Sequence, residues 1–199
     1  MQTQHINIVI SVFNEEAGLV SFAGQLSEAL SKAPDQRWNV IWVNDGSTDD
    51  SQSIIDAWHF TPEHIHATKI QFSRNYGHEA AMLAGIDHAL PGPVVCMDAD
   101  GQHPPNTLLE MVNTFDQGSE IVLTERVDRA DGGRLKKWAS RAFYSMMNRL
   151  SNFDFEPNSS DFFLISERVA GILKEEFRER NRFIRGFIQT IGFKKTTVS

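Results

Sequence analysis

The stretch VCMDADGQHPP, residues 95–105, decides how this sequence is interpreted. An apolar run that ends in Met97 gives way to two carboxylates, Asp98 and Asp100, separated by one alanine. Residues two apart in an extended segment face the same side, so we expect both carboxylates to point the same way from a strand end. Their mutual repulsion falls when a cation lies beside them. The stretch therefore predicts a cation site at the end of a buried strand.

The candidate ligands of this cation are oxygen atoms. They come from Asp98, Asp100 and the side-chain amide of Gln102. Oxygen ligands of this kind suit Mg²⁺ or Mn²⁺. His103 is either a further ligand for Mn²⁺ or a residue that caps the turn, and Pro104 is placed to open the next helix.

Hydrophobic periodicity predicts an α/β fold. Short β-branched runs alternate with segments whose apolar residues recur at helical spacing. This alternation is typical of a mostly parallel sheet flanked by helices. In such sheets, ligands bind at the carboxyl ends of the strands, where the clusters NEE, NDGS, SRN and DAD fall. We expect strands at 6–12, 40–43, 70–72, 94–97 and 121–124, and helices at 16–32, 51–58 and 78–89.

The last third of the chain is organised differently. Residues 135–150 have an apolar face at helical spacing, which either packs on the sheet or contacts a membrane. A further strand is expected at 162–165. The chain stops soon after another apparent strand has begun, so we expect the natural protein to continue beyond residue 199.

Composition narrows the class of protein. The 199 residues carry a net charge of -7, which argues against general nucleic-acid binding. The single cysteine, Cys96, lies in an apolar run and forms no disulfide framework. We find no apolar run of about 18 residues and hence no transmembrane helix.

A second polar cluster, VNDGSTDD, occupies residues 43–50. Gly46 permits a tight turn with positive φ. Asp45 is then expected to point from the strand end into the crevice, where it can accept hydrogen bonds from a base or ribose. Thr48 and Asp49 are better placed to cap the next helix.

Taken together, these motifs resemble glycosyltransferase family two. The likeness rests on SVFNEE, VNDGSTDD, FSRNYGHEAAMLAGI and MDADGQHPP, and it continues through LKKWASRAFYSMMNRLS, SSDFFLISERV and RFIRGFIQTIGF. The chain looks most like the branch that uses polyprenyl phosphate, which includes dolichol-phosphate mannose synthase and bacterial undecaprenyl-phosphate glycosyltransferases. The resemblance implies a GT-A type nucleotide-diphospho-sugar transferase fold in a single domain. Residues 1–125 would bind the nucleotide sugar, and residues 126–199 would bind the acceptor before membrane-associated segments.

The resemblance also implies roles for individual residues. The donor nucleotide sugar would contact the FNEE segment and the strand ends, and a metal ion would bind near its diphosphate. Asp161 would lie near the reacting anomeric carbon, and Asp100 would share the catalytic role through the metal. The implied donor contacts are Asn14, Glu15, Asp45, Arg74 and Asp98, and the implied metal ligands are Asp98, Asp100 and Gln102.

A phosphate monoester acceptor is already ionised and needs no base, so Asp161 would mainly position groups. Nearby cations must then offset its charge, and the candidates are Arg126, Arg134 and Arg185. Two departures from the family concern the same turn, where Ser160 replaces a glycine and Phe163 replaces an arginine. These two residues put anion binding at that turn in question.

The implied function is an inverting, metal-dependent transfer of a hexose from a nucleotide sugar to polyprenyl (undecaprenyl or dolichyl) phosphate at the cytoplasmic membrane face. A UDP-sugar donor is favoured over a GDP-sugar, and homo-oligomerisation is left open. Two alternatives remain. One is a glycosyltransferase that acts on a glycan hydroxyl in cell-surface polysaccharide synthesis, and the other is an inactive nucleotide-sugar-binding subunit. A dehydrogenase is disfavoured because no G-x-G-x-x-G follows the first strand.

Overall fold

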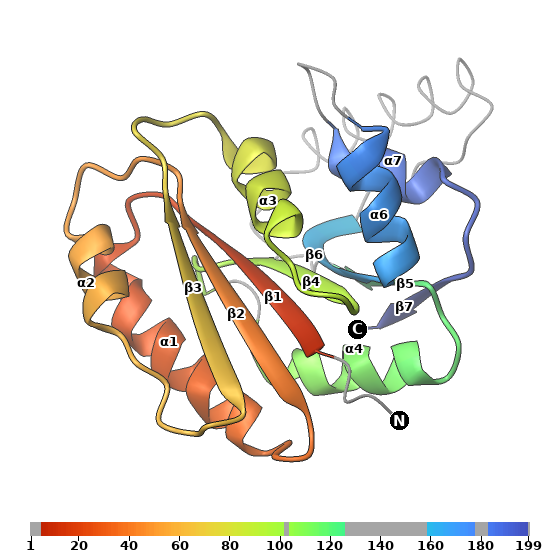
Figure 1. The fold of residues 1–199 in the computed structure, drawn as a ribbon, viewed down its shortest axis with the longest axis horizontal. Coiled ribbons are helices and arrows are strands. Elements are labelled where there is room, and N and C mark those ends of the chain that lie inside the picture. Colours follow the sequence, from red (N-terminus) through yellow and green to blue (C-terminus); the bar gives the residue numbers. More distant parts are fainter. Residues whose placement is uncertain (1–4, 102–103, 126–158, 178–182, 199) are drawn as a thin grey trace, which may run out of the picture.

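The computed structural model describes residues 5–101, 104–125, 159–177 and 183–198, which contribute to one seven-stranded sheet (Figure 1). The strand order across the sheet is β3-β2-β1-β4-β6-β5-β7. The strands are β1 (His5–Val12), β2 (Arg37–Asn44), β3 (Ile65–Gln71), β4 (Val94–Asp98), β5 (Ile121–Glu125), β6 (Ser159–Ile165) and β7 (Lys195–Val198). The helices are α1 (Glu16–Ser31), α2 (Ser51–Ala57), α3 (His78–Asp87), α4 (Thr107–Asp116), α6 (Glu167–Glu175) and α7 (Ile184–Thr190).

The sheet is mostly parallel, as the sequence predicted. β6 alone runs antiparallel to its neighbours β4 and β5, and every other strand pair is parallel. The pairing of β1 with β4 sets Ser11 beside Asp98 at the carboxyl ends of both strands. This register brings the DAD segment next to the loop that follows β1.

Helices cover both faces of the sheet (Figure 1). α1, α2 and α4 lie on one face, and α3, α6 and α7 lie on the other. Each face has its own apolar core, with Trp38 and Trp42 fully buried on the first and Phe163 fully buried on the second. Central strands covered on both sides are apolar at nearly every position, which explains why they were recognisable from sequence.

Two sequence-based boundaries were wrong. The third strand was expected at 70–72, but β3 runs from Ile65 to Gln71 because its backbone pairs with β2 over that whole length. Its outward-facing residues are polar, so only part of the strand had an apolar signal. Pro104 does not open the next helix. Its carbonyl accepts a hydrogen bond from the Thr107 N–H in a turn that precedes α4, and Thr107 is the first helical residue.

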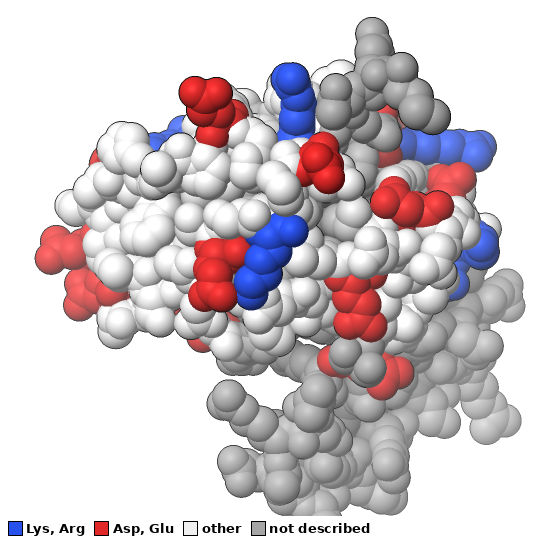
Figure 2. Space-filling model, turned by 90° about the horizontal axis from the view of Figure 1, so that it is seen from below, with Lys and Arg blue, Asp and Glu red and all other residues white. Residues whose placement is uncertain are grey.

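The surface shown in Figure 2 carries scattered charges. Acidic and basic side chains are interspersed there, and the coloured residues form no continuous basic area. Among the helices in the described ranges, none is long and apolar enough to cross a bilayer. The expected helix at 135–150 lies outside the described residues.

Helix α3 packs very closely on β1 at Gly85. A Cβ added at this glycine would lie 2.2 Å from Cγ1 of Val9, far inside van der Waals contact. Val9 belongs to the core on the α3 side of the sheet, and Gly85 is buried in α3. The absence of a side chain at Gly85 therefore fixes how near α3 can approach the strand that carries Ser11.

We predict that Gly85→Ala lowers the free energy of unfolding by about 1–3 kcal/mol, because the added methyl group overpacks the core. Urea denaturation measures this change. Gly171→Ala in α6 is the matched control, since nothing lies within 4 Å of its added Cβ, and it should be neutral or stabilising by up to about 1 kcal/mol. Val9→Ala introduced into the Gly85→Ala protein should recover part of the loss. An equal loss in both glycine variants would contradict the packing argument.

Candidate active site

The loops after β1, β2, β3 and β4 enclose a cavity of about 280 Å³ at the carboxyl edge of the sheet. Acidic residues are prominent in its lining, and none of its lining residues in the described ranges is a lysine or an arginine. The lining residues are Ser11, Val12, Phe13, Glu15, Asp45, Asn75, His78, Asp98, Ala99 and Asp100. Parallel topology places a ligand site at this edge, as the sequence predicted.

Hydrogen bonds fasten the loop after β1 to the loop after β2. The Asn14 side-chain carbonyl accepts from the Thr48 N–H at 2.9 Å, and the Asn14 N–H donates to the Ser47 hydroxyl at 3.0 Å. The Glu15 N–H donates to the Ser51 hydroxyl at 2.9 Å. Asn14 also has a positive φ of 56°, which asparagine tolerates better than most residues. The structure therefore gives Asn14 a structural contact in addition to its predicted role in binding the donor.

Asp45 is buried and holds the loop after β3. One of its carboxylate oxygens accepts from the Tyr76 N–H at 2.7 Å, and the other accepts from the Gly77 N–H at 2.9 Å. Only 3% of the residue is exposed, although it still lines the cavity. The neighbouring Gly46 has a φ of 68°, as the turn requires, and a Cβ there would lie 2.2 Å from the Arg74 backbone. Asp45 thus orders this side of the cavity through the backbone of the next loop.

Of the two residues expected to cap α2, Asp49 makes such a contact. Its carboxylate accepts from the Ser51 N–H at 3.0 Å and from the Glu16 N–H at 3.0 Å. Thr48 instead faces Asn14, with its hydroxyl 3.4 Å from the Asn14 carbonyl oxygen. The capping expectation therefore holds for Asp49 alone.

The DAD segment brings two carboxylates to the same cavity. Asp98 is partly buried at the end of β4 and Asp100 is exposed, while the intervening Ala99 is only 2% exposed. The alternation predicted for an extended segment therefore continues past the end of the strand. Gln102, the third predicted metal ligand, lies outside the described residues.

The carboxylate groups that line the cavity are suited to bind a divalent cation. Burial raises the pKa of Glu15, and the negative charges of Asp100, Asp98 and Asp49 raise it further. The part of this shift that comes from the neighbouring carboxylates reflects a negative local potential. Carboxylate oxygens gathered in this way are the ligands that Mg²⁺ and Mn²⁺ prefer.

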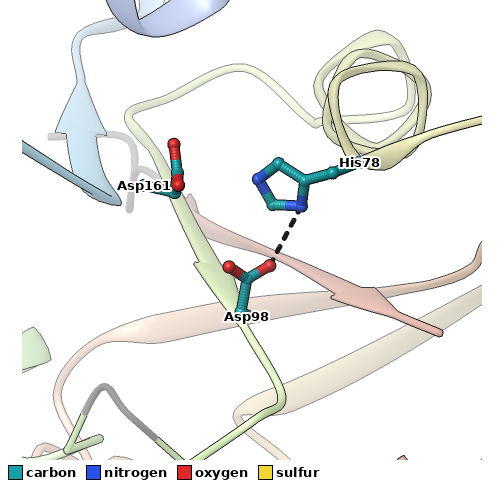
Figure 3. Close-up of side chains that lie close together, drawn as sticks. All are labelled: His78, Asp98 and Asp161. Atoms are coloured by element: carbon teal, nitrogen blue, oxygen red, sulfur yellow. Dashed lines mark ion pairs between the residues drawn. The ribbon is translucent and has the colours of Figure 1, made fainter. Parts of the chain in front are cut away.

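His78 is a site residue that the sequence analysis missed. It is the first residue of α3, and its ligand atom, one from Asp98 and one from Asp161 lie within 4.8 Å of one another. Figure 3 shows the three side chains converging from α3, β4 and β6. The ligands expected from the sequence all lie close to Asp98 in the chain, whereas the start of α3 brings an imidazole to the same strand end. Its position directly after the SRNYG cluster indicated that it lies near the edge of the sheet, but not which strand end it reaches.

A short hydrogen-bonded triangle fixes the orientation of His78. Its Nδ1 lies 3.1 Å from Oδ1 of Asp98 and 2.9 Å from the Ser11 hydroxyl. The Ser11 hydroxyl in turn donates to Oδ1 of Asp98 at 2.5 Å. The β1–β4 register places Ser11 and Asp98 side by side, so the backbone pairing builds two corners of this triangle.

The pKa of His78 is raised above its usual value. Burial is the largest single influence and lowers this pKa, but the hydrogen bond to Asp98 and the charges of Asp98, Asp161 and Glu79 together outweigh it. The charged imidazolium form is therefore favoured in the folded protein. That positive charge offsets part of the repulsion between Asp98 and Asp161.

Asp161 lies on β6 and forms an ion pair with Arg185 of α7. Nε of Arg185 is 3.3 Å from Oδ1 of Asp161, and the two side chains are 30% and 17% exposed. Ser160 and Phe163, the two residues that depart from the family pattern, are both only 1% exposed. Phe163 packs in the core beneath α3 and α6. β6 therefore supplies no cation at position 163, and α7 brings one from elsewhere in the chain.

Arg74 lines a second cavity of about 630 Å³ that adjoins the first. Phe13 and Asn75 contribute to both cavities. The Arg74 guanidinium lies 4.1 Å from the centre of the Tyr76 ring and donates to the Asn75 carbonyl at 3.2 Å. Two remaining predicted site residues, Arg126 and Arg134, lie outside the described residues.

Sequence comparisons agree with this geometry. A family model described as Glycosyl transferase family 2 matches residues 7–171. A prophage bactoprenol glucosyl transferase homolog of Escherichia coli (strain K12) is 33% identical over 193 residues, covering 97% of this chain and 62% of that protein. The bactoprenol glucosyl transferase of Shigella phage SfV is 34% identical over 187 residues, covering 94% of this chain and 60% of its own length. The chain thus spans about 60% of the length of these relatives.

Two solved structures show the same fold. S. aureus TarS 1-349 in complex with UDP-GlcNAc has a TM-score of 0.63 at 14% identity, covering 98% of this chain and 56% of that one. Glucosyl-3-phosphoglycerate synthase from Mycobacterium tuberculosis, in complex with Mn²⁺, UDP-Glc and phosphoglyceric acid, has a TM-score of 0.56 at 20% identity, covering 83% of this chain and 58% of that one. The likeness confirms the predicted GT-A type of fold.

We predict that His78 stabilises the cation-free protein more at low pH than at high pH. Its pKa is raised on folding, so its contribution is complete below the unfolded value of about 6.5 and is lost as the pH rises through the folded value. Urea denaturation of the wild type and of His78→Gln without divalent cations tests this at about pH 5.5 and about pH 8.5. The difference in unfolding free energy should be larger at the lower pH, and the same difference at both would contradict the assignment.

Proposed function

Because the chain belongs to glycosyl transferase family 2, we propose that it transfers a hexose from a nucleotide sugar to a polyprenyl phosphate. The observation that carries this proposal is the pair of adjoining cavities at the carboxyl edge of the sheet. The smaller is lined by Asp98 and Asp100, and beside it Asp161 is paired with Arg185. The proposed donor site and the proposed acceptor site would thus be adjacent.

The donor would extend across both cavities. The larger one, about 630 Å³, offers Phe13 and Arg74 for a nucleobase and its ribose. The smaller one, about 280 Å³, holds the carboxylates that suit a cation and a diphosphate. A UDP-sugar is the favoured donor, and the UDP and UDP-sugar complexes of the two fold neighbours support this preference.

Asp98 and Asp100 would hold Mg²⁺ or Mn²⁺, with Gln102 assisting. When bound, the cation neutralises charge that develops on the departing diphosphate. Glu15 increases the negative potential around this site, because its own carboxyl group lies near both aspartates. The Mn²⁺ in the glucosyl-3-phosphoglycerate synthase complex supports the same class of cofactor.

The reaction would be a single displacement at the anomeric carbon. An oxygen of the acceptor phosphate forms the new bond to C1 while the bond from C1 to the diphosphate oxygen breaks, which inverts the configuration. A phosphate monoester is ionised at neutral pH, so no general base is required. Asp161 would orient the acceptor and the sugar, and Arg185 would offset the charge that the acceptor brings.

Two observations favour a lipid phosphate over a glycan hydroxyl. The relatives from Escherichia coli and Shigella phage SfV carry the name bactoprenol glucosyl transferase. Arg185 lies where a phosphate approaching Asp161 needs a cation. The intact carboxylates Asp45, Asp98, Asp100 and Asp161 argue against an inactive binding subunit. A lipid acceptor would place the reaction at a membrane surface, at the cytoplasmic face.

We predict that Asp100→Asn lowers metal-dependent transfer by about 100-fold or more, because a cation held at the diphosphate supplies several kcal/mol. Asp100 is exposed, so the melting temperature should stay the same. Transfer from a UDP-sugar is measured across a range of Mn²⁺ and Mg²⁺ concentrations. Asp35→Asn, in the exposed turn before β2, is the control. Undiminished transfer by Asp100→Asn would remove the metal assignment.

We predict that neutralising Arg126 and Arg134 together raises the acceptor KM much more than the donor KM, because both are assigned to the acceptor phosphate. Initial rates with undecaprenyl phosphate and a UDP-sugar measure both constants. A parallel assay offers a glycan acceptor without phosphate. Equal effects on both constants, or transfer to the glycan alone, would favour the hydroxyl-acceptor alternative.

A further inference from the structure

Four consecutive residues, Tyr76 to Glu79, connect the donor cavity with helix α7. The backbone N–H groups of Tyr76 and Gly77 donate to Asp45, and His78 contacts Asp98. Glu79 instead contacts helix α7, which carries Arg185. This short segment therefore contacts the donor side and the acceptor side of the proposed site.

Glu79 makes one long-range hydrogen bond to the backbone. Its Oε2 accepts from the N–H of Ile184, the first residue of α7, at 3.0 Å, across 105 positions of sequence. Phe183, the residue that precedes α7, makes no side-chain capping bond, so Glu79 satisfies this N–H from another helix. A partly buried carboxylate is costly unless it is hydrogen-bonded, and burial raises the pKa of Glu79.

The residue after this contact is Arg185. Because Glu79 holds Ile184, the first turn of α7 is fixed relative to α3, and the Arg185 side chain starts from a fixed backbone position. Its guanidinium then reaches Asp161 at 3.3 Å. Gly186 contributes as well, because a Cβ there would lie 2.2 Å from the Phe183 ring, which is folded back against the helix.

We propose that Glu79 is a positioning residue, which anchors the start of α7 so that Arg185 is held beside Asp161 for the acceptor phosphate. This inference rests on the proposed function. Glu79 acts through the backbone of Ile184 and touches neither substrate. Its substitution should therefore affect acceptor binding and leave donor binding intact.

Two substitutions at Glu79 distinguish a role of its hydrogen bond to Ile184 from a role of its negative charge. Glu79→Gln keeps an oxygen that can accept from the Ile184 N–H, whereas Glu79→Ala removes the acceptor and leaves that N–H without it. An anchoring role requires that glutamine largely restores what alanine loses. Glu175→Ala, on the exposed end of α6, is the matched control for loss of a glutamate.

The kinetic test uses the full protein with undecaprenyl phosphate and a UDP-sugar. Glu79→Ala should raise the acceptor KM about tenfold and change the donor KM less than about twofold, while Glu79→Gln stays within about threefold of wild type. Arg185→Ala should raise the acceptor KM at least as much, and the double variant Glu79→Ala/Arg185→Ala should be no worse than Arg185→Ala alone. The proposal would be overturned if the two substitutions raised the acceptor KM independently, so that their increases multiplied in the double variant. Equal changes in the acceptor KM and the donor KM of Glu79→Ala would also overturn it.

Amide hydrogen exchange tests the anchor without activity. The segment 183–190 should exchange faster in Glu79→Ala than in wild type, and at the wild-type rate in Glu79→Gln and Glu175→Ala. Unchanged exchange in Glu79→Ala would overturn the anchoring role. If neither the wild type nor any variant transfers sugar to a phosphate acceptor, the proposed function fails and the acceptor role of Glu79 fails with it. If the wild type transfers sugar normally and Glu79→Ala does so with unchanged KM values, this inference alone is refuted.

Discussion

Crowding of negative charge at one edge of the sheet is the constraint on which the rest of the site depends. Parallel strands end at the same edge, so Asp98 and Asp100 approach the acidic side chain of Glu15 there. Antiparallel β6 adds Asp161 from the opposite direction. Such a cluster is tolerated only when positive charge or hydrogen-bond donors are close. The chain supplies them as His78, Arg185 and the Ser11 hydroxyl.

These compensating groups come from different elements of the fold. His78 at the start of α3 lies between Asp98 and Asp161, while Arg185 of α7 pairs with Asp161. The exposed Asp100 is the carboxylate nearest to open solvent, where a cation and a diphosphate can enter. The fold therefore compensates Asp161 internally and leaves Asp100 open to ligands, which agrees with the proposed donor and its metal ion.

Much of the fold was predictable because it depends on local pattern. Buried parallel strands are continuous apolar runs, so β1, β2, β4 and β5 were found within a few residues of their observed bounds. β3 was placed too late because it is an edge strand with polar residues facing outward. Asp98, Asp100 and Glu15 were found together because each follows a strand in a recognisable motif. His78 and Glu79 were overlooked because nothing in their own segment shows which strand end or helix they reach.

The sequence by itself determined the order of the elements, the edge of the sheet where the polar clusters gather and the family to which the chain belongs. Period and turn chemistry act over a few residues, and motif spacing is visible without coordinates. Only the tertiary structure decided that Asp45 is buried against the next loop, that His78 joins Asp98 and Asp161, and that Glu79 holds the helix that carries Arg185. Each of those contacts joins residues that lie far apart in the sequence. Which residues meet is set by how the helices and loops pack on the shared sheet.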